Sequence, residues 1–441
     1  MRIAVIGSGI SGLTCARLLA PQHDVTVFEA DSRIGGHANT VSVSIPGGEY
    51  DIDTGFIVYN ERTYPNFTRL LAGLNVETTP TSMSFSVRSD RDGLEYNGTS
   101  PNGVFAQRRN LLRPKFYRLL YDIMRFNRVG SNDLQHVSHT QTVGDYVTER
   151  GFSQQFSEQY LFPMGAAIWS CPFDDFARFP IRFILHFYVN HGLLSLRNRP
   201  VWRVIGGGSK SYVDRLIEPF RDKIRLCCPV HSVQRSGEDV TIRHSLGVDR
   251  FDEVIFACHS DQALRLLGGE ADGDETEVLS AFPYRSNTAV LHTDDSLLPK
   301  RRRAWASWNY HIGNKPSSMP TVTYNVNILQ KIQSEQTFCI TLNEDDSIDR
   351  TKVLAEFEYS HPVFTARREE FQARHQHFIR RNRTSFCGAY WRNGFHEDGV
   401  VSALSVCEQF GIPASTAFTS KTVPRGSCPD GAVSLLKEGT L

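Results

Sequence analysis

The chain has 441 residues, with 48 Lys and Arg against 48 Asp and Glu, and 40% of its residues are hydrophobic. This composition is that of a globular protein, neither disordered nor fibrous, and the length allows two or three domains. The net charge of zero argues against nucleic acid as a partner, because nucleic-acid binding is driven by clustered Lys and Arg.

Membrane spans, signal peptides and metal sites are not expected. The most apolar stretch, residues 179–189, contains Arg182 and His186 and is too short to cross a bilayer. Glycines interrupt the N-terminal apolar stretch and no cleavage site follows, so we expect a cytoplasmic protein. The nine cysteines include no Cys-x-x-Cys pair, which predicts buried thiols and neither a disulfide framework nor a zinc site.

The N-terminus predicts a βαβ unit. Residues 3–6 form a β-branched run typical of a buried parallel strand, and the glycine-rich residues 7–12 predict a turn. Leu13, Ala16 and Ala20 have helical spacing up to Pro21, and residues 25–28 predict the second strand.

Helical periodicity dominates residues 105–190, where Phe116, Leu119, Leu120, Ile123 and Met124 are expected on one face of a helix. Strand patterns return after the glycine turn 206–208, with a helix up to residue 217 and strands at 224–226, 240–243 and 254–257. A mixed region covers 268–375. A last helix after residue 399 precedes a tail that we expect to be disordered.

The motif Gly7-x-Gly9-x-x-Gly12 lies between the first strand and helix, and Glu29 ends the second strand. Gly7 permits the tight turn, Gly9 permits close approach of a pyrophosphate, and Gly12 permits close packing of helix and strand. The helix N-terminus attracts phosphate, and Glu29 is suited to a ribose diol. The set predicts a dinucleotide site, and the carboxylate disfavours NADP.

Residues 29–37 continue this motif, and together with residues 53–56, 162–170, 291–294, 304–310, 359–364 and 394–399 they carry a resemblance to a known superfamily. The chain resembles the flavin-containing amine oxidases, protoporphyrinogen oxidases and phytoene desaturases. Within these, it resembles a bacterial FAD-binding group associated with cyclopropane-fatty-acid-synthase-like lipid methyltransferases. It departs from the pattern before Gly394, where Trp391-Arg392-Asn393 replaces a small or glycine-containing spacer.

The resemblance implies FAD as the cofactor and assigns residues to it. At the adenosine and pyrophosphate end it implies Ser11, Glu29, Ala30, Gly36 and His37, beside the glycines of the turn, with Val230 at the adenine. Nearer the flavin ring it implies Gly55, Phe56, Asp398, Gly399 and Val400. Asp398-Gly399-Val400 is expected to begin the final helix, whose amides would stabilise negative charge at flavin N1 and C2=O.

The resemblance also implies an α/β fold with a discontinuous Rossmann-type FAD-binding domain and an interleaved α+β substrate domain. The expected FAD-binding domain comprises residues 1–85, 200–267 and 376–420, the substrate domain residues 86–199 and 268–375, and the tail residues 421–441.

The implied activity is an FAD-dependent oxidation or desaturation of a hydrophobic substrate, foremost a fatty acyl chain, methylated or not, by hydride transfer to flavin N5. Two alternatives stay open: a flavin amine oxidase that releases hydrogen peroxide, with Trp308 and Trp391 lining its site, and a non-catalytic FAD-binding partner of a lipid methyltransferase. Candidate catalytic or substrate-orienting residues are Trp308, Tyr324, Asn327 and His361.

Other motifs support competing functions less well. Residues 206–211 lack the glycines of a P-loop at positions 204 and 209, no Gly-x-Ser-x-Gly occurs, and His186, His191, His375 and His377 lack metal-ligand spacing. Residues 108–128 carry seven basic residues and one acid, interleaved with aromatics. This pattern allows peripheral contact with an anionic membrane at its inner face, although an ordinary solvated helix has the same pattern.

Overall fold

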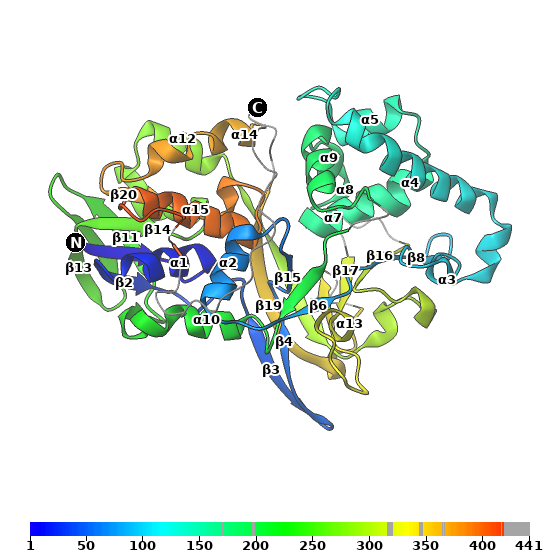
Figure 1. The fold of residues 1–441 in the computed structure, drawn as a ribbon, viewed down its shortest axis with the longest axis horizontal. Coiled ribbons are helices and arrows are strands. Elements are labelled where there is room, and N and C mark those ends of the chain that lie inside the picture. The colour runs from blue at the N-terminus through cyan, green and yellow to red at the C-terminus, as the bar shows by residue number, and fades with distance from the viewer. Residues whose placement is uncertain are drawn as a thin grey trace, which may run out of the picture.

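The computed structural model describes residues 1–169, 171–195, 199–314, 321–343, 347–363, 365, 367–415, 417 and 418. Ser170, Phe364 and the expected tail 421–441 lie outside the described residues. The chain forms two lobes joined by long strands (Figure 1). The first lobe contains both the N-terminal strand and the final helix, so distant parts of the sequence meet there.

A five-stranded parallel sheet is the core of the first lobe. Its order is β10 (Ile224–Arg225), β2 (Asp24–Phe28), β1 (Arg2–Ile6), β14 (Glu253–Phe256) and β20 (Thr384–Phe386). Four of the five residues of β1 are buried, as expected for a β-branched strand covered on both faces. The predicted strands at 3–6, 25–28 and 254–257 are confirmed. The strand order reverses direction between β1 and β14, and in such sheets ligands bind beyond the carboxyl ends at this point.

Two helices from opposite ends of the sequence pack together on this sheet. Helix α1 (Ile10–Leu19) follows the glycine turn, and helix α15 (His396–Glu408) is the last helix of the described chain. Leu13 and Ala16 of α1 share one hydrophobic cluster with Val400 and Ala403 of α15, and all four are fully buried. Helices α2 (Pro65–Gly73) and α10 (Lys210–Ile217) contribute to the same cluster.

The second lobe contains a seven-stranded, mostly antiparallel sheet. Its order is β19 (Val353–Pro362), β15 (Tyr284–His292), β18 (Cys339–Leu342), β17 (Thr321–Asn325), β16 (Trp308–Ile312), β7 (Phe85–Ser89) and β8 (Leu94–Asn97). Only β16 and β7 pair in parallel among these described strands. The long strands β15 and β19 run between the lobes in Figure 1.

A helical layer completes the second lobe. It consists of α3 (Pro101–Val104), α4 (Pro114–Asp133), α5 (Val143–Glu149), α6 (Gln154–Phe156), α7 (Phe162–Trp169), α8 (Phe173–Ala177) and α9 (Ile181–Asn190). The predicted helix around Phe116 and Leu119 is confirmed as α4, and both side chains are buried. The expectation for Met124 is wrong: this side chain is 58% exposed, because it lies on the opposite face of α4.

Smaller elements surround the two sheets. The strands are β3 (Thr40–Ile45) and β4 (Gly48–Asp53), then β5 (Val58–Asn60), β6 (Thr78–Thr81) and β9 (Trp202–Ile205), then β11 (Val230–Arg235), β12 (Val240–His244) and β13 (Gly247–Phe251). The helices are α11 (Ser260–Leu267), α12 (Gly273–Ser280), α13 (Val326–Gln330) and α14 (Arg368–Gln372).

The expected domain boundaries stay a prediction. Side chains of α12 and α14, such as Val278 and Phe371, pack in a cluster with Ile6 and Phe256 of the parallel sheet. These two helices therefore lie on the first lobe, although residues 268–375 were expected in the substrate domain. Among the helices of the described residues, none is long and apolar enough to span a membrane.

Candidate functional site

The turn after β1 requires glycine at two positions for different reasons. Gly7 has φ +108°, and a Cβ there would lie 2.8 Å from the Ala257 carbonyl oxygen. A Cβ on Gly12 would lie 2.1 Å from the carbonyl oxygen of Gly7. At Gly9 a Cβ would meet nothing within 4 Å, so packing does not explain this glycine. The open space above Gly9 adjoins the N-terminus of α1, whose first N–H groups lack partners within the helix.

Glu29, at the end of β2, reaches back to the glycine turn. Its carboxylate accepts hydrogen bonds from the backbone N–H of Ser8 at 2.9 Å and the Ser8 hydroxyl at 2.5 Å. It also accepts one from the N–H of Asp31 at 2.9 Å. The carboxylate therefore organises the turn in addition to any role toward a ribose. Ala30 beside it is exposed.

The loop 35–37 lies directly on the turn. Gly36 has φ +58°, and a Cβ there would lie 3.1 Å from the Cα of Gly9. His37 follows, and its Nε2 is buried without a hydrogen-bond partner among the described residues. Burial holds the pKa of His37 well below its usual range. A buried, unpartnered nitrogen beside the glycine turn is suited to a polar group of a ligand.

Two further histidines surround His37. Its ring centroid lies 5.4 Å from that of His361 and 6.4 Å from that of His259. Burial lowers the pKa of His361 to about 4 and also lowers the pKa of His259, so these rings are neutral near pH 7. Asn287 Nδ2 donates to His361 Nδ1 at 3.0 Å, which leaves the ring proton of His361 on Nε2. No sequence motif marks His259, although it follows β14 at the carboxyl end of the sheet.

The final helix begins earlier than expected. It starts at His396, not at Asp398, because the Asp398 carboxylate accepts from the Phe395 N–H at 2.9 Å and so caps the helix from its third position. The N–H of Gly399 already donates to the carbonyl oxygen of Phe395. The unpaired first-turn amides therefore belong to His396 and Glu397, and the expected stabilisation of the flavin by the amides of this helix stays a prediction.

The N- and C-terminal parts of the predicted site meet. A Cβ on Gly399 would lie 2.9 Å from the Ser11 hydroxyl oxygen, so Gly399 allows α15 to approach the start of α1. Asp398 is buried, which raises its pKa to about 6. Val400 is fully buried in the cluster between the helices, so its side chain contacts the core.

Gly55 and Phe56 join the same region. A Cβ on Gly55 would lie 2.2 Å from the His37 carbonyl oxygen, and the ring of Phe56 stacks on His396 at 3.5 Å. Nε2 of His396 lies 2.9 Å from the hydroxyl of Tyr212. No local sequence pattern predicts a role for His396, because its partners Phe56 and Tyr212 come from segments far away in the sequence.

Val230, expected near the adenine, is the first residue of β11 and pairs with His244 in the adjacent strand. It lies two residues after Cys228, whose N–H donates to the carbonyl oxygen of Glu29 at 2.8 Å. This bond ties the start of β11 to the end of β2.

Glu397 caps helix α2 from a distant part of the sequence. Its carboxylate accepts from the backbone N–H groups of Asn66 and Phe67, at 3.1 and 2.9 Å, and from the Asn66 side-chain amide at 2.6 Å. We expect Glu397→Ala to lower the free energy of unfolding by about 1–2 kcal/mol, because buried amides lose their acceptor. Urea unfolding checks this, and Glu397→Gln, which keeps one acceptor oxygen, should lose less. Equal stability of the alanine variant and the wild type would contradict the capping role.

The catalytic candidates fall into two groups. His361 lies with His37, whereas Trp308 and Tyr324 are directly opposite each other on β16 and β17, with ring centroids 5.0 Å apart. Burial raises the pKa of Tyr324. The Asn327 amide donates to the carbonyl oxygen of Gln336 and accepts from the N–H of Phe338, so it holds the local backbone, and its substrate-orienting role stays a prediction.

Trp391 is not available as a substrate contact. Its side chain is buried and stacks on His375 at 4.3 Å, in the cluster behind the parallel sheet with Phe282 and Phe378. The expectation that Trp391 lines an amine site is therefore wrong, since the short helical turn at residues 389–391 directs the ring into the core.

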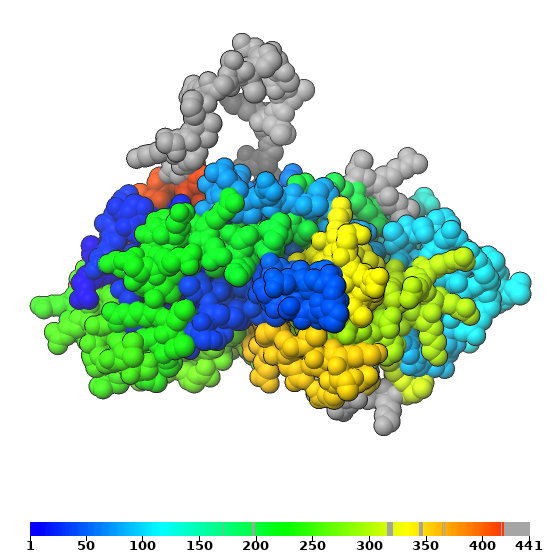
Figure 2. All heavy atoms as spheres, turned by 90° about the horizontal axis from the view of Figure 1, so that it is seen from below, coloured from blue at the N-terminus to red at the C-terminus, as the bar shows by residue number. Residues whose placement is uncertain are grey.

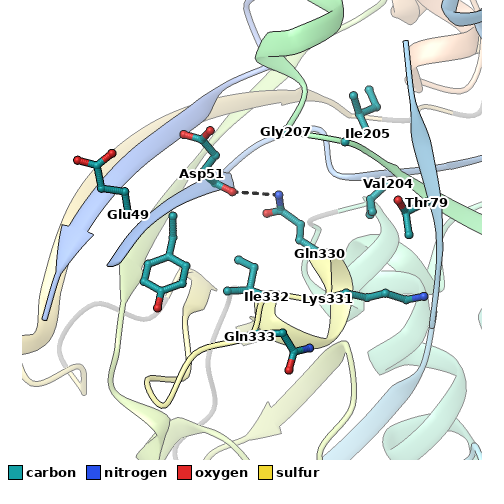
Figure 3. A pocket seen from close by; sticks show the side chains of 13 residues that line it. Glu49, Asp51, Thr79, Val204, Ile205, Gly207, Gln330, Lys331, Ile332 and Gln333 are labelled. Atoms are coloured by element: carbon teal, nitrogen blue, oxygen red, sulfur yellow. Dashed lines mark hydrogen bonds between the residues drawn. The ribbon is translucent and has the colours of Figure 1, made fainter. Parts of the chain in front are cut away.

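A pocket of about 460 Å³ lies outside this region (Figure 3). Its wall includes the glycine turn 206–208, the carboxylates of Glu49 and Asp51, and the C-terminal end of α13. Gln330 donates from its side-chain amide to the Asp51 carbonyl oxygen at 3.2 Å. The lining contains two acidic residues and one lysine, Lys331, and this net negative charge disfavours phosphate, which agrees with rejection of the P-loop interpretation. The lining contains none of the predicted site residues.

Several solved structures share this fold. A putrescine oxidase variant is 12% identical, with a TM-score of 0.66 over 93% of this chain and 99% of that chain. A putative protoporphyrinogen oxidase from Exiguobacterium sp. 255-15 is 16% identical, with a TM-score of 0.65 over 93% and 98%. A fatty acid isomerase from P. acnes that produces CLA is 15% identical, with a TM-score of 0.63 over 93% and 98%. The predicted α/β fold with a substrate domain is confirmed.

Sequence relatives point the same way. An L-amino-acid oxidase from Pseudechis australis is 20% identical over 73% of this chain, and a 4,4'-diapophytoene desaturase from Staphylococcus aureus (strain MRSA252) is 35% identical over 18%. The chain spans 62% and 15% of the lengths of these two relatives. Residues 10–301 match the flavin-containing amine oxidoreductases, a family that depends on FAD. The chain therefore belongs to the flavin-containing amine oxidoreductase family.

Proposed function

We propose that this protein is an FAD-dependent oxidoreductase that oxidises or desaturates a hydrophobic substrate. Family membership and the meeting of residues 7–12, 35–37 and 396–399 support FAD at the carboxyl ends of β1 and β14. The residues proposed to hold FAD are Gly7, Gly9, Ser11, Gly12, Glu29, Ala30, Gly36, His37, Gly55, Phe56, Val230, Asp398, Gly399 and Val400. Of these, Ala30 would act through the backbone, and Val400 would support the site by packing between the helices.

The chemistry of these residues fits FAD. The open space above Gly9, the first amides of α1 and the unpartnered Nε2 of His37 suit a diphosphate, and Glu29 suits a ribose. The first amides of α15 and the ring of Phe56 suit the flavin end. When bound, FAD supplies the acceptor for a hydride from the substrate. The chain itself binds and orients the substrate and excludes water.

The apolar side chains at the junction between the two lobes support the proposal of a hydrophobic substrate. Phe395, immediately before α15, packs both against the cluster of the first lobe and against the aromatic cluster of the helical layer. Trp308 and Tyr324 pack against that second cluster and are themselves only half-buried. An apolar wall therefore adjoins the proposed flavin end. The names of the fatty acid isomerase and the diapophytoene desaturase agree with a lipid substrate. The more specific proposal of an acyl chain that can already be methylated comes from the sequence resemblance.

An amine substrate is the second candidate, because putrescine oxidase and cyclohexylamine oxidase share the fold over 93% of this chain. The buried position of Trp391 removes one of the two aromatic residues expected for that site.

A third form of the proposal is a flavoprotein without turnover that binds a lipid methyltransferase. His361, Trp308 and Tyr324 remain the proposed substrate-orienting residues in both catalytic forms.

Anaerobic reduction of the purified protein tests these proposals. We expect a yellow protein whose flavin is bleached by acyl lipids and not by a panel of amines. Trp308→Ala should retain FAD but raise the substrate KM about tenfold, the effect of losing one large apolar contact.

Bleaching by amines alone, with peroxide produced on reoxidation, would replace the lipid proposal with the amine one. A yellow protein that no substrate reduces, but that co-purifies with a methyltransferase, would favour the non-catalytic form. A colourless protein that cannot be reconstituted with FAD would overturn all three.

A further inference from the structure

The outer end of the second lobe exposes apolar side chains that the proposed reaction does not use. Five residues of the 3-10 turn Arg108–Leu112 and of α4 are involved, and we call this set the α4 surface. Their exposed fractions are 46% for Leu111, 88% for Leu112, 47% for Tyr117, 55% for Tyr121 and 58% for Met124. Soluble surfaces seldom gather such side chains on one helix, so this cluster requires an explanation.

The exposure does not result from loose packing of the helix. Tyr117, Tyr121 and Met124 are spaced i, i+4 and i+7 and therefore share one face of α4. On the opposite face, Leu119 and Phe126 are fully buried in the core of the helical layer. The helix thus has two apolar faces. The exposed face makes local contacts only at its edge, where Tyr117 lies against Phe105 and donates to the Leu111 carbonyl oxygen.

Within residues 108–128, the exposed charged side chains have one sign. Residues 108–128 include seven cations, Arg108, Arg109, Arg113, Lys115, Arg118, Arg125 and Arg128. The single acid of the segment, Asp122, is fully buried and accepts from Arg118 at 3.0 Å. The segment therefore presents cations and apolar groups to the solvent and no carboxylate. Lys115 and Arg128 are both exposed: Arg128 follows the apolar stripe on the same helix face, and Lys115 lies in the first turn of α4.

The position of the surface agrees with a large, flat partner. In Figure 1, α3 and α4 form the edge of the molecule farthest from the parallel sheet. In Figure 2 the cyan residues of this segment protrude at the end opposite the blue N-terminal strand. A convex, protruding surface can enter a bilayer interface, whereas a protein that binds an apolar helix usually surrounds it with a groove.

We propose that the α4 surface docks the protein on an anionic lipid bilayer. Leu111, Leu112 and Met124 would enter the boundary between head groups and acyl chains. The two tyrosines suit the same depth, because their rings are apolar and their hydroxyls polar. The surrounding Arg and Lys lie at the level of the lipid phosphates, where each cation contributes to binding. This proposal does not depend on which substrate the flavin oxidises.

Flotation of the FAD-loaded protein with vesicles tests the proposal. We expect binding to vesicles of mixed phosphatidylglycerol and phosphatidylcholine, weakened by salt, and little binding to phosphatidylcholine alone. The triple variant Leu112→Ser, Tyr121→Ser, Met124→Ser should bind at least about tenfold more weakly. Lys115→Glu with Arg128→Glu should lose binding to a similar extent.

A matched control uses two exposed apolar residues elsewhere. Leu246 and Val248 of the β12–β13 hairpin are 73% and 52% exposed, and Leu246→Ser with Val248→Ser should bind vesicles like the wild type. FAD content and melting temperature show that each variant is folded. Absence of binding to anionic vesicles, or equal binding by the triple variant, would overturn the proposal. So would a dimer that the triple variant converts to a monomer, because the surface would then be a protein interface.

Discussion

Gly12→Ala should yield a destabilised protein that does not retain FAD. The added Cβ would lie 2.1 Å from the carbonyl oxygen of Gly7 and 3.0 Å from the Ala257 side chain. The first contact involves backbone, so relief requires movement of α1 away from β1. We expect a loss of about 1–3 kcal/mol in the free energy of unfolding, typical of overpacking. Because the turn and the start of α1 move together, FAD affinity should fall at least about a hundredfold.

Gly9→Ala separates binding from folding at the same turn. Its Cβ would meet nothing within 4 Å, and Gly9 has φ −70°, which alanine adopts without strain. We therefore expect the apoprotein to keep the stability of the wild type, while FAD binding weakens because the methyl group occupies the approach of the diphosphate. Fluorescence titration with FAD, together with urea unfolding of the apoprotein, measures both quantities.

Gly273→Ala is the matched control for these two variants. Gly273 lies in the first turn of α12, and a Cβ there also meets nothing within 4 Å. This variant should bind FAD like the wild type and be as stable or slightly more stable. Unchanged FAD affinity in Gly9→Ala would exclude the open space above Gly9 as the diphosphate site.

The sequence could predict this turn because its determinants are local. Residues 2–29 contain the first strand, the glycines, the helix and Glu29. The strand and the helix are recognised by their periodicity, the glycines by their steric role, and Glu29 by its position at the end of the second strand. The prediction that Ser11 and Gly399 lie close together depended on family resemblance, because no periodicity relates segments almost 400 residues apart. The start of α15 was misplaced, because the cap at Asp398 acts backward on Phe395.

The rest of the site depends on contacts between segments remote in sequence. His37, His259 and His361 come from three separate segments, and each alone resembles an ordinary buried histidine. Trp391 appeared in a motif beside the flavin segment, but side-chain direction in a short 3-10 turn cannot be inferred from spacing. The direction of such a side chain depends on its packing against distant segments, and the local residue pattern does not predict that packing.

Acidification should destabilise the protein well above the pH at which carboxylates usually protonate. Burial lowers the pKa of His191, His292, His361 and His375 to about 4 and that of His396 to about 3, from an ordinary value of about 6.5. Below pH 6.5 the unfolded chain therefore binds protons on these rings while the folded protein does not. Stability from these histidines is complete above pH 6.5 and is lost as the pH falls toward 4.

Two buried carboxyl groups act in the opposite direction. Burial raises the pKa of Asp53 and Asp398 to about 6, so the folded protein takes up protons there before the unfolded chain does. Their protonation stabilises the fold as the pH falls from 6 toward 4, but two such groups only partly offset five histidines. The net loss between pH 7.5 and 5.5 should be on the order of 5 kcal/mol.

A single substitution shows whether buried histidines cause this loss. Nε2 of His375 lies 2.8 Å from the Phe386 carbonyl oxygen, so His375→Gln keeps a donor at that position and removes the titrating ring. Urea unfolding at pH 7.5 and 5.5 should then show a loss smaller by about 1.4 kcal/mol than in the wild type. His377→Gln, at an exposed position two residues away, should behave like the wild type. If His375→Gln loses as much stability as the wild type, protonation of His375 does not contribute to the acid sensitivity. The loss of stability at low pH would then have another origin.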